Sequence, residues 1–94
     1  MLDIRVQDGG TVALSGRLDA SESDRALAEL QKQPGPLTIE CSGLEYISSA
    51  GISVIMQTYK RLAATGQPFH LVGMAPRVKN VFMYAGLDKL LGIQ

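Results

Sequence analysis

The hydrophobic residues of this chain change their spacing twice between residues 37 and 72. At first they alternate with polar residues, as in a half-buried strand: Leu37, Ile39 and Cys41. From 51 to about 65 they recur on one helical stripe: Ile52, Ile55, Met56, Tyr59 and Leu62. Residues 69–72 (FHLV) indicate a strand again. A strand–helix–strand unit forms a right-handed crossover between parallel strands, so the chain is constrained to an α/β fold.

A hairpin is predicted ahead of this unit. Apolar residues alternate on both sides of Asp8-Gly9-Gly10, and Asp-Gly between two alternating runs is a strong hairpin signal. The expected strands cover 2–7 and 11–15, and 16–19 are expected to form a loop.

Three helices are expected to cover the sheet. The first begins with Ser21 as its cap and stops at Pro34-Gly35-Pro36. After the strand 37–41 and a turn at 42–43, the second runs from 51 to about 65 and ends at Gly66. The third opens at Pro76 and ends at Gly86, with Val78, Val81, Phe82 and Ala85 on its apolar side. Residues 87–93 are expected to add a partial turn and an edge strand.

These elements predict one α/β domain over residues 1–94. Its order would be β-β-α-β-α-β-α, with a mixed sheet of four or five strands, an opening hairpin and about three helices.

Composition narrows the classes of function. The formal net charge is zero and no basic stripe is present, so no nucleic-acid partner is expected. No segment resembles a signal peptide or a bilayer span, so we expect no direct membrane insertion. Cys41 is the single cysteine and cannot form an intramolecular disulfide, which fits a cytoplasmic location.

No catalytic centre is predicted. Metal-ligand clusters and cofactor loops are absent from the sequence, so we expect no metal, no cofactor and no enzyme activity. Cys41 and His70 could in principle form a nucleophile–base pair. Both lie in strand segments among apolar neighbours, which favours a buried core cysteine and an outward histidine.

The most informative segment for function is 46–55 (YISSAGISVI). Ser48 and Ser49 stand where a strand end turns into a helix. A serine there can cap the helix. It can also carry a phosphate, because a helix N-terminus offers free N–H donors and the positive end of the helix dipole. We expect Ser48 to be the cap.

Three segments carry a family resemblance: residues 16–19 (GRLD), 39–47 (IECSGLEYI) and 48–51 (SSAG). Together they resemble the STAS domain, the family of bacterial anti-sigma factor antagonists. Residues 16–19 are similar to the family's G-x-L-D loop, and 39–47 to its D-L-S-G-V-x-x-I strand. Residues 48–51 (SSAG) look like the D-S-S-G or S-S-A-G start of its second helix. The resemblance covers essentially the whole chain and implies the STAS fold.

The resemblance also implies a function. The second serine of the four-residue segment, here Ser49, would be phosphorylated by a serine-kinase anti-sigma factor and dephosphorylated by a PP2C-type phosphatase. The unphosphorylated form would bind the kinase, and the free protein is expected to be a monomer. The expected partner-binding residues are Arg17, Asp19, Ser48, Ala50, Gly51 and Ser53.

Two alternatives remain open at the level of sequence. Ser48 stands where well-studied members carry aspartate, so Ser48 is the alternative acceptor, while Glu40 replaces the strand aspartate. Some STAS proteins are also unphosphorylated subunits of larger complexes, for example beside the ATPase of a phospholipid-transport system. Arg17, Asp19 and the second helix would then form a constitutive interface.

Overall fold

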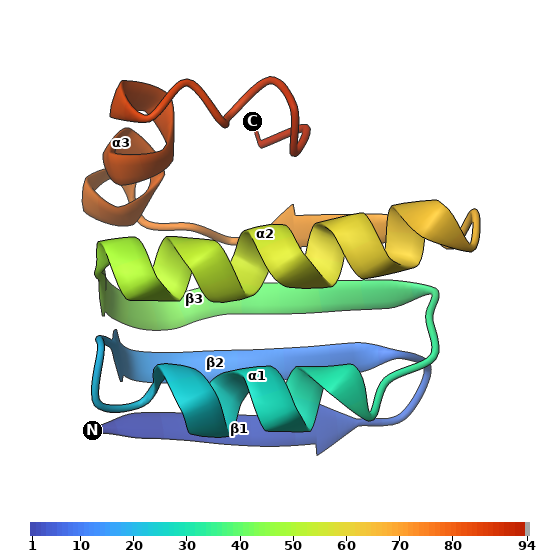
Figure 1. Ribbon diagram of the computed structural model, residues 1–94. Coiled ribbons are helices and arrows are strands. Elements are labelled where there is room, and N and C mark those ends of the chain that lie inside the picture. The colour runs from blue at the N-terminus through green and yellow to red at the C-terminus, as the bar shows by residue number, and fades with distance from the viewer. Residues whose placement is uncertain (94) are drawn as a thin grey trace.

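The computed structural model describes residues 1–93. Its strands are β1 (Leu2–Gln7), β2 (Thr11–Leu18), β3 (Leu37–Ile47) and β4 (Phe69–Val72), and its helices are α1 (Ser23–Gln31), α2 (Ser49–Ala64) and α3 (Pro76–Tyr84). The sheet order is β1-β2-β3-β4, with β1 antiparallel to β2 and the other neighbours parallel (Figure 1). The predicted mixed sheet with an opening hairpin and parallel crossovers is confirmed.

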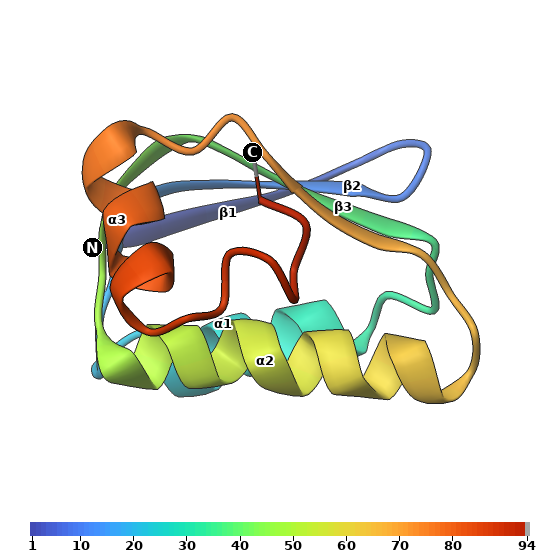
Figure 2. The same ribbon diagram turned by 90° about the horizontal axis from the view of Figure 1, so that it is seen from above.

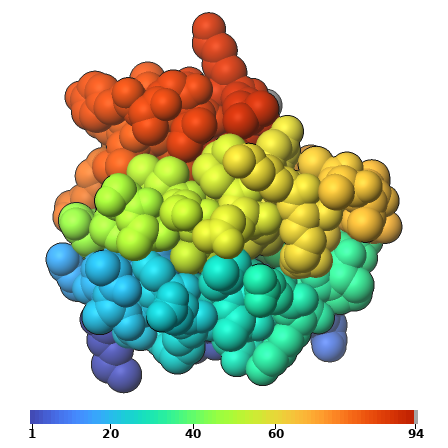
Figure 3. All heavy atoms as spheres, in the orientation of Figure 1, coloured from blue at the N-terminus to red at the C-terminus, as the bar shows by residue number. Residues whose placement is uncertain are grey.

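The helices are distributed unevenly around the sheet. Figure 1 shows α1 and α2 side by side, and Figure 2 shows that both lie on one face of the sheet, with α3 and the C-terminal segment past the β4 side. In the space-filling view, α1 and α2 make the lower and middle parts of the face toward the viewer, and α3 and the C-terminal segment make its upper part (Figure 3). Among residues 1–93, no helix lies on the opposite face of the sheet, where the strands carry mainly polar and small side chains.

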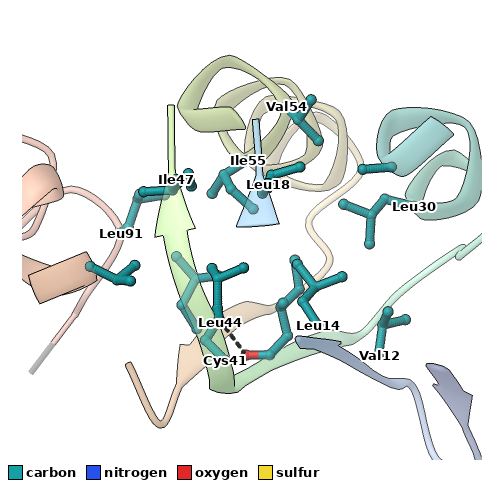
Figure 4. Packing of buried hydrophobic residues seen from close by; sticks show 14 of the residues in the cluster. Val12, Leu14, Leu18, Leu30, Cys41, Leu44, Ile47, Val54, Ile55 and Leu91 are labelled. Carbon is teal, nitrogen blue, oxygen red and sulfur yellow. Dashed lines mark hydrogen bonds between the residues drawn. The ribbon is translucent and has the colours of Figure 1, made fainter. Parts of the chain in front are cut away.

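Much of the hydrophobic core lies between the sheet and helices α1 and α2 (Figure 4), and Val78 and Phe82 of α3 also belong to it. Inward side chains of β2 and β3, such as Leu14 and Leu44, pack toward Leu30 of α1 and Ile55 of α2. All four are at most 2% exposed. At about 25 cal/mol per Å² of apolar area, burial of each such side chain contributes roughly 1.5–3 kcal/mol. This packing, rather than any metal or disulfide, holds the described part of the chain together.

The buried face of α2 is wider than its predicted stripe. Ile55 and Leu62 are fully buried as expected, whereas three other stripe members are only partly buried against the core: Ile52, Met56 and Tyr59. Val54 and Thr58 are buried in addition, and the Thr58 hydroxyl donates to the Val54 carbonyl at 2.9 Å. The difference arises because α2 packs against α1 as well as the sheet, which a single-stripe pattern cannot anticipate.

Two predicted irregular segments are strand. Residues 16–18 belong to β2, and the turn expected at 42–43 is wrong because β3 continues through it. The register between β2 and β3 shifts here, and the Glu40 carboxylate accepts from the Ser42 amide at 3.0 Å and from its hydroxyl at 2.8 Å. A Cβ on Gly43 would lie 2.7 Å from Ser15 Cβ. Gly43 therefore allows close strand approach rather than a turn.

The expected cap of α1 is also wrong. The N-cap is Glu22, which makes no side-chain capping bond, and the helix starts at Ser23. The Ser21 hydroxyl instead donates to Asp19 Oδ1 at 2.7 Å, and the Ser23 hydroxyl donates to the Asp19 carbonyl at 2.8 Å. The start of α1 is therefore organised by the preceding loop.

The other helix ends follow the sequence more closely. Pro76 opens α3, and Gly66, with φ +71°, follows the end of α2. Val78 and Phe82 are buried, but Ala85 is exposed and lies just past α3. Residues 87–93 form turns, and the predicted edge strand is absent from the described chain. Leu91 instead packs into the core (Figure 4), so apolar burial overrides strand pairing there.

Candidate functional site

The candidate site lies where β2 and β3 end together. Because these strands are parallel, their carboxyl ends meet at the same edge of the sheet, which brings the segment after Leu18 beside the start of α2. The Ser48 amide donates to the Leu18 carbonyl at 3.0 Å. Sequence segments 16–19 and 48–51 thus lie next to each other at one corner of the fold (Figure 1).

Ser48 is the N-cap of α2, as predicted. Its backbone is extended, and its Oγ accepts a hydrogen bond of 3.1 Å from the Gly51 amide. The same hydroxyl donates to the Leu18 carbonyl at 3.4 Å. The Ser48 hydroxyl is therefore committed to holding the helix start against β2.

Ser49 is placed differently. It is the first residue of α2 and is exposed. Both side-chain hydrogen bonds at this helix start use the Ser48 hydroxyl, so that of Ser49 is left to solvent. The first turn of α2 carries no acidic residue, and the helix N-terminus is the positive end of the dipole. Chemically, the Ser49 oxygen is accessible and lies where a negative charge is stabilised.

The remaining predicted residues of α2 divide into surface and interior. Ser53 is exposed one helical turn after Ser49, and its hydroxyl accepts a hydrogen bond of 3.2 Å from the Gln57 side-chain nitrogen Nε2. Ala50 is half-buried. Gly51 is buried, and a Cβ there would lie 2.6 Å from the Leu18 carbonyl oxygen. Gly51 thus faces inward, where only glycine lets the helix start approach β2.

Asp19 and Arg17 border the same corner. The hydrogen bond from the Ser21 hydroxyl holds the pKa of the Asp19 carboxyl below its usual 3.8. Arg17 Nε lies 3.9 Å from Asp19 Oδ2, with the side chains 53% and 30% exposed. The Asp19 carboxylate is therefore ionised at neutral pH and only loosely paired.

Tyr46 belongs to this corner, and sequence reasoning did not select it. The Arg17 guanidinium carbon lies 4.2 Å from the centre of the Tyr46 ring. The two residues are register partners in β2 and β3. The only signal in the sequence was an aromatic residue two positions before Ser48, because the pairing depends on a register that includes a shift.

Cys41 and His70 do not form a nucleophile–base pair. Burial raises the pKa of the Cys41 thiol to about 12, with a further contribution from Glu40, so the thiol is neutral. Cys41 is buried on the helix-covered face, whereas His70 is exposed beside Thr38 on the other face. Within residues 1–93, no group of three potential metal ligands is found, and no helix is long and apolar enough to cross a membrane.

The sequence was compared with models of known protein families. A family model described as "Mlab, STAS domain" matches residues 3–92. The chain belongs to the STAS domain family. The hairpin, the parallel crossovers and the SSAG helix start are therefore features of a STAS domain, as the sequence resemblance implied.

Solved structures share the fold of this STAS domain. An anti-sigma factor antagonist from Mycobacterium paratuberculosis has a TM-score of 0.80 at 24% identity, covering 97% of this chain and 81% of its own. The Bacillus cell fate determinant SpoIIAA in its phosphorylated form has a TM-score of 0.67 at 19% identity, covering 95% and 86%. The unphosphorylated form of SpoIIAA has a TM-score of 0.70 at 20% identity, and the match covers 100% of this chain and 99% of that chain. At these identities the likeness concerns the fold alone.

Proposed function

We propose that this STAS domain is an anti-sigma factor antagonist whose binding to a serine-kinase anti-sigma factor is controlled by phosphorylation of Ser49. One observation carries the proposal: of two adjacent serines, Ser48 is used as the helix cap and Ser49 presents a solvent-exposed hydroxyl. The fold shared with antagonists, including SpoIIAA in both phosphorylation states, supports it.

The domain can accept the phosphate without rearranging. Phosphoserine carries roughly −1.5 to −2 charges at neutral pH. At the start of α2 the backbone N–H donors and the dipole stabilise this charge by about 0.3–1 kcal/mol at an exposed site. Ser49 is exposed, so no buried contact must break.

A partner packed over Ser49 could not accept a phosphate there. The interface would enclose a desolvated dianion, and like-charge juxtaposition across an interface costs several kcal/mol. A loss of about 4 kcal/mol lowers affinity about a thousandfold. The switch therefore works by blocking a surface, not by moving the domain.

The cap geometry makes Ser48 the weaker acceptor candidate. Phosphorylating its oxygen would remove the donor to the Leu18 carbonyl and crowd the bond from the Gly51 amide. Ser48 then contributes to the site by fixing where Ser49 lies. In this proposal the protein is a cytoplasmic binding module rather than an enzyme, is monomeric when free, and loses its phosphate to a PP2C-type phosphatase.

The deciding experiment is phosphorylation of the purified protein by lysate of its own organism with ATP. Wild type, Ser49→Ala, Ser48→Ala and the control Thr65→Ala, an exposed hydroxyl residue just past the far end of α2, run side by side, with intact mass and peptide mapping as readouts. We expect one phosphate, absent only from Ser49→Ala. A phosphate that persists in Ser49→Ala, or no phosphate where a control substrate shows active kinase, contradicts the proposal.

Binding supplies the second half of the test. The kinase is purified through its activity on this protein, and its binding is measured in the presence of ADP. It should bind wild type and Ser49→Ala equally, and it should bind Ser49→Glu far more weakly. The neutral variant Ser49→Gln separates charge from size and should bind close to wild type. Equal binding of Ser49→Glu and wild type would end the switching model.

The second candidate is an unphosphorylated STAS subunit of a larger complex, such as a phospholipid-transport ATPase assembly. The observation that favours it is Ser48, which stands where well-studied switching members carry aspartate. The surface formed by exposed Arg17, half-buried Asp19 and exposed Ser53 would then be a constitutive interface. Stable co-purification with an ATPase, without phosphate on native protein, would support this candidate over the first.

A further inference from the structure

Arg17 and Tyr46 form an ordered pair on the helix-free side of the sheet. Each precedes a fully buried neighbour, Leu18 or Ile47, so both point away from the core. They are direct register partners, and the guanidinium carbon lies 4.2 Å from the ring centre. The Tyr46 residue is nevertheless 40% exposed. The guanidinium therefore lies over the ring at the surface, outside the core.

The Arg17 guanidinium has unused binding capacity. Its Nε lies 3.9 Å from Asp19 Oδ2, which is beyond hydrogen-bond length, and Asp19 Oδ1 already accepts from the Ser21 hydroxyl. No hydrogen bond within residues 1–93 uses the Arg17 side-chain donors. A planar guanidinium that is stacked but not hydrogen-bonded offers its edge to a carboxylate in bidentate geometry.

The ring beneath Arg17 has two consequences for binding. Stacking fixes a long, flexible side chain before the partner arrives, which reduces the entropy lost on association. Tyrosine and arginine are also the residue types that dominate interface energies when they are desolvated together. The pair lies next to the start of α2. Leu18 follows Arg17 directly, and its carbonyl oxygen accepts a hydrogen bond from the Ser48 amide.

We propose that the Arg17–Tyr46 stack is a carboxylate-recognition element of the docking surface and that it receives an acidic side chain of the protein partner. This inference rests on the proposed function, because it assigns part of the same partner surface.

The test measures affinity for the Ser49 kinase, in ADP, by isothermal titration. Arg17→Lys keeps the charge but loses the planar fork, and Tyr46→Leu keeps apolar area but loses the aromatic face. Each is expected to weaken binding by about tenfold or more. Tyr46→Phe keeps the ring and should bind within about twofold of wild type.

Two controls accompany these variants. Arg5→Lys makes the same change at an arginine of β1, where the guanidinium pairs with Asp3 at 2.8 Å, and should leave affinity unchanged. Arg17→Gln should reduce the salt dependence of binding, because one interfacial charge pair is lost. Thermal unfolding of every variant shows whether an affinity change reflects loss of fold.

The outcomes separate the two proposals. If Ser49→Glu loses binding while folded Arg17→Lys and Tyr46→Leu bind like wild type, the stack is not a recognition element but the switch stands. If Ser49→Glu binds normally while the stack variants fail, the surface is a docking site without phosphorylation control. Equal weakening by Arg17→Lys and Arg5→Lys would overturn the inference, because the loss of affinity would then not depend on the arginine that lies over Tyr46.

Discussion

The Ser48 amide donates a hydrogen bond of 3.0 Å to the carbonyl of Leu18, which lies 30 residues earlier in the chain. This bond fastens the end of β2 to the start of α2. It places Ser49, Asp19 and the Arg17–Tyr46 stack at one edge of the sheet. The proposed switch depends on this junction, because a charge added at Ser49 can affect a partner that also contacts β2.

The two serines should respond oppositely to removal of their hydroxyls. Ser48→Ala loses the bond from the Gly51 amide and should lower the free energy of unfolding by about 1 kcal/mol. Ser49→Ala removes an exposed hydroxyl and should change it by less than about 0.5 kcal/mol. Urea denaturation checks both values. Equal losses would mean that Ser49 shares the capping role.

The small residue at 51 is required by close approach of the helix to β2. Gly51→Ala would place a Cβ 2.6 Å from the Leu18 carbonyl oxygen and 2.8 Å from Ile47 Cγ1. Overpacking of this kind costs about 1–3 kcal/mol, more than the roughly 1 kcal/mol that alanine gains in helix propensity. Thermal unfolding should show a lower midpoint. The exposed control Ser53→Ala should leave the midpoint unchanged. A higher midpoint for Gly51→Ala would contradict the close approach of residue 51 to Leu18.

A negative charge should have opposite effects at the two ends of α2. Ser49→Glu adds it at the N-terminus and should raise the free energy of unfolding by about 0.3–1 kcal/mol. Ala64→Glu adds it at the last residue of the same helix, which is also exposed, and should lower stability by a similar amount. Chemical denaturation at low ionic strength gives the comparison. Destabilisation by Ser49→Glu would show that the domain does not tolerate charge there.

Cys41 should be inert in the folded protein. Burial raises its pKa from 9.0 to about 12, so at pH 8 the reactive thiolate is scarce and the sulfur is covered. Because the unfolded thiol ionises first, stability from this group is complete below pH 9 and declines as pH rises toward 12. Modification by a thiol reagent should be slow in buffer and fast in denaturant. Rapid labelling of folded protein would contradict this.

The Ser21 hydroxyl should control the ionisation of Asp19. Its hydrogen bond of 2.7 Å is the main cause of the lowered Asp19 pKa. Ser21→Ala should therefore raise that pKa toward 3.8, as followed by NMR titration of the carboxyl carbon. The lowered value favours the folded state above pH 4, and this contribution falls as pH drops through the folded pKa. Ser53→Ala is the matched control, and no change in Ser21→Ala would exclude the hydroxyl as the cause.

The order and type of the elements were already determined by the sequence. Alternation around Asp8-Gly9-Gly10 specified the hairpin, and the change of period within 37–72 specified the crossover. These patterns are local, and they follow from the geometry of a strand or a helix with one buried face. The Ser48 cap was predictable for the same reason, since capping involves residues three positions apart.

Contacts between distant segments were decided only by the tertiary structure. The register shift between β2 and β3 carries β3 through 42–43 and sets Tyr46 opposite Arg17. The packing of α2 against α1 buries Val54 and Thr58, and the core takes Leu91 away from an edge strand. The loop at Asp19, not a local cap, organises the start of α1. Such features depend on which surfaces meet across the fold, and residue spacing along the chain does not contain that information.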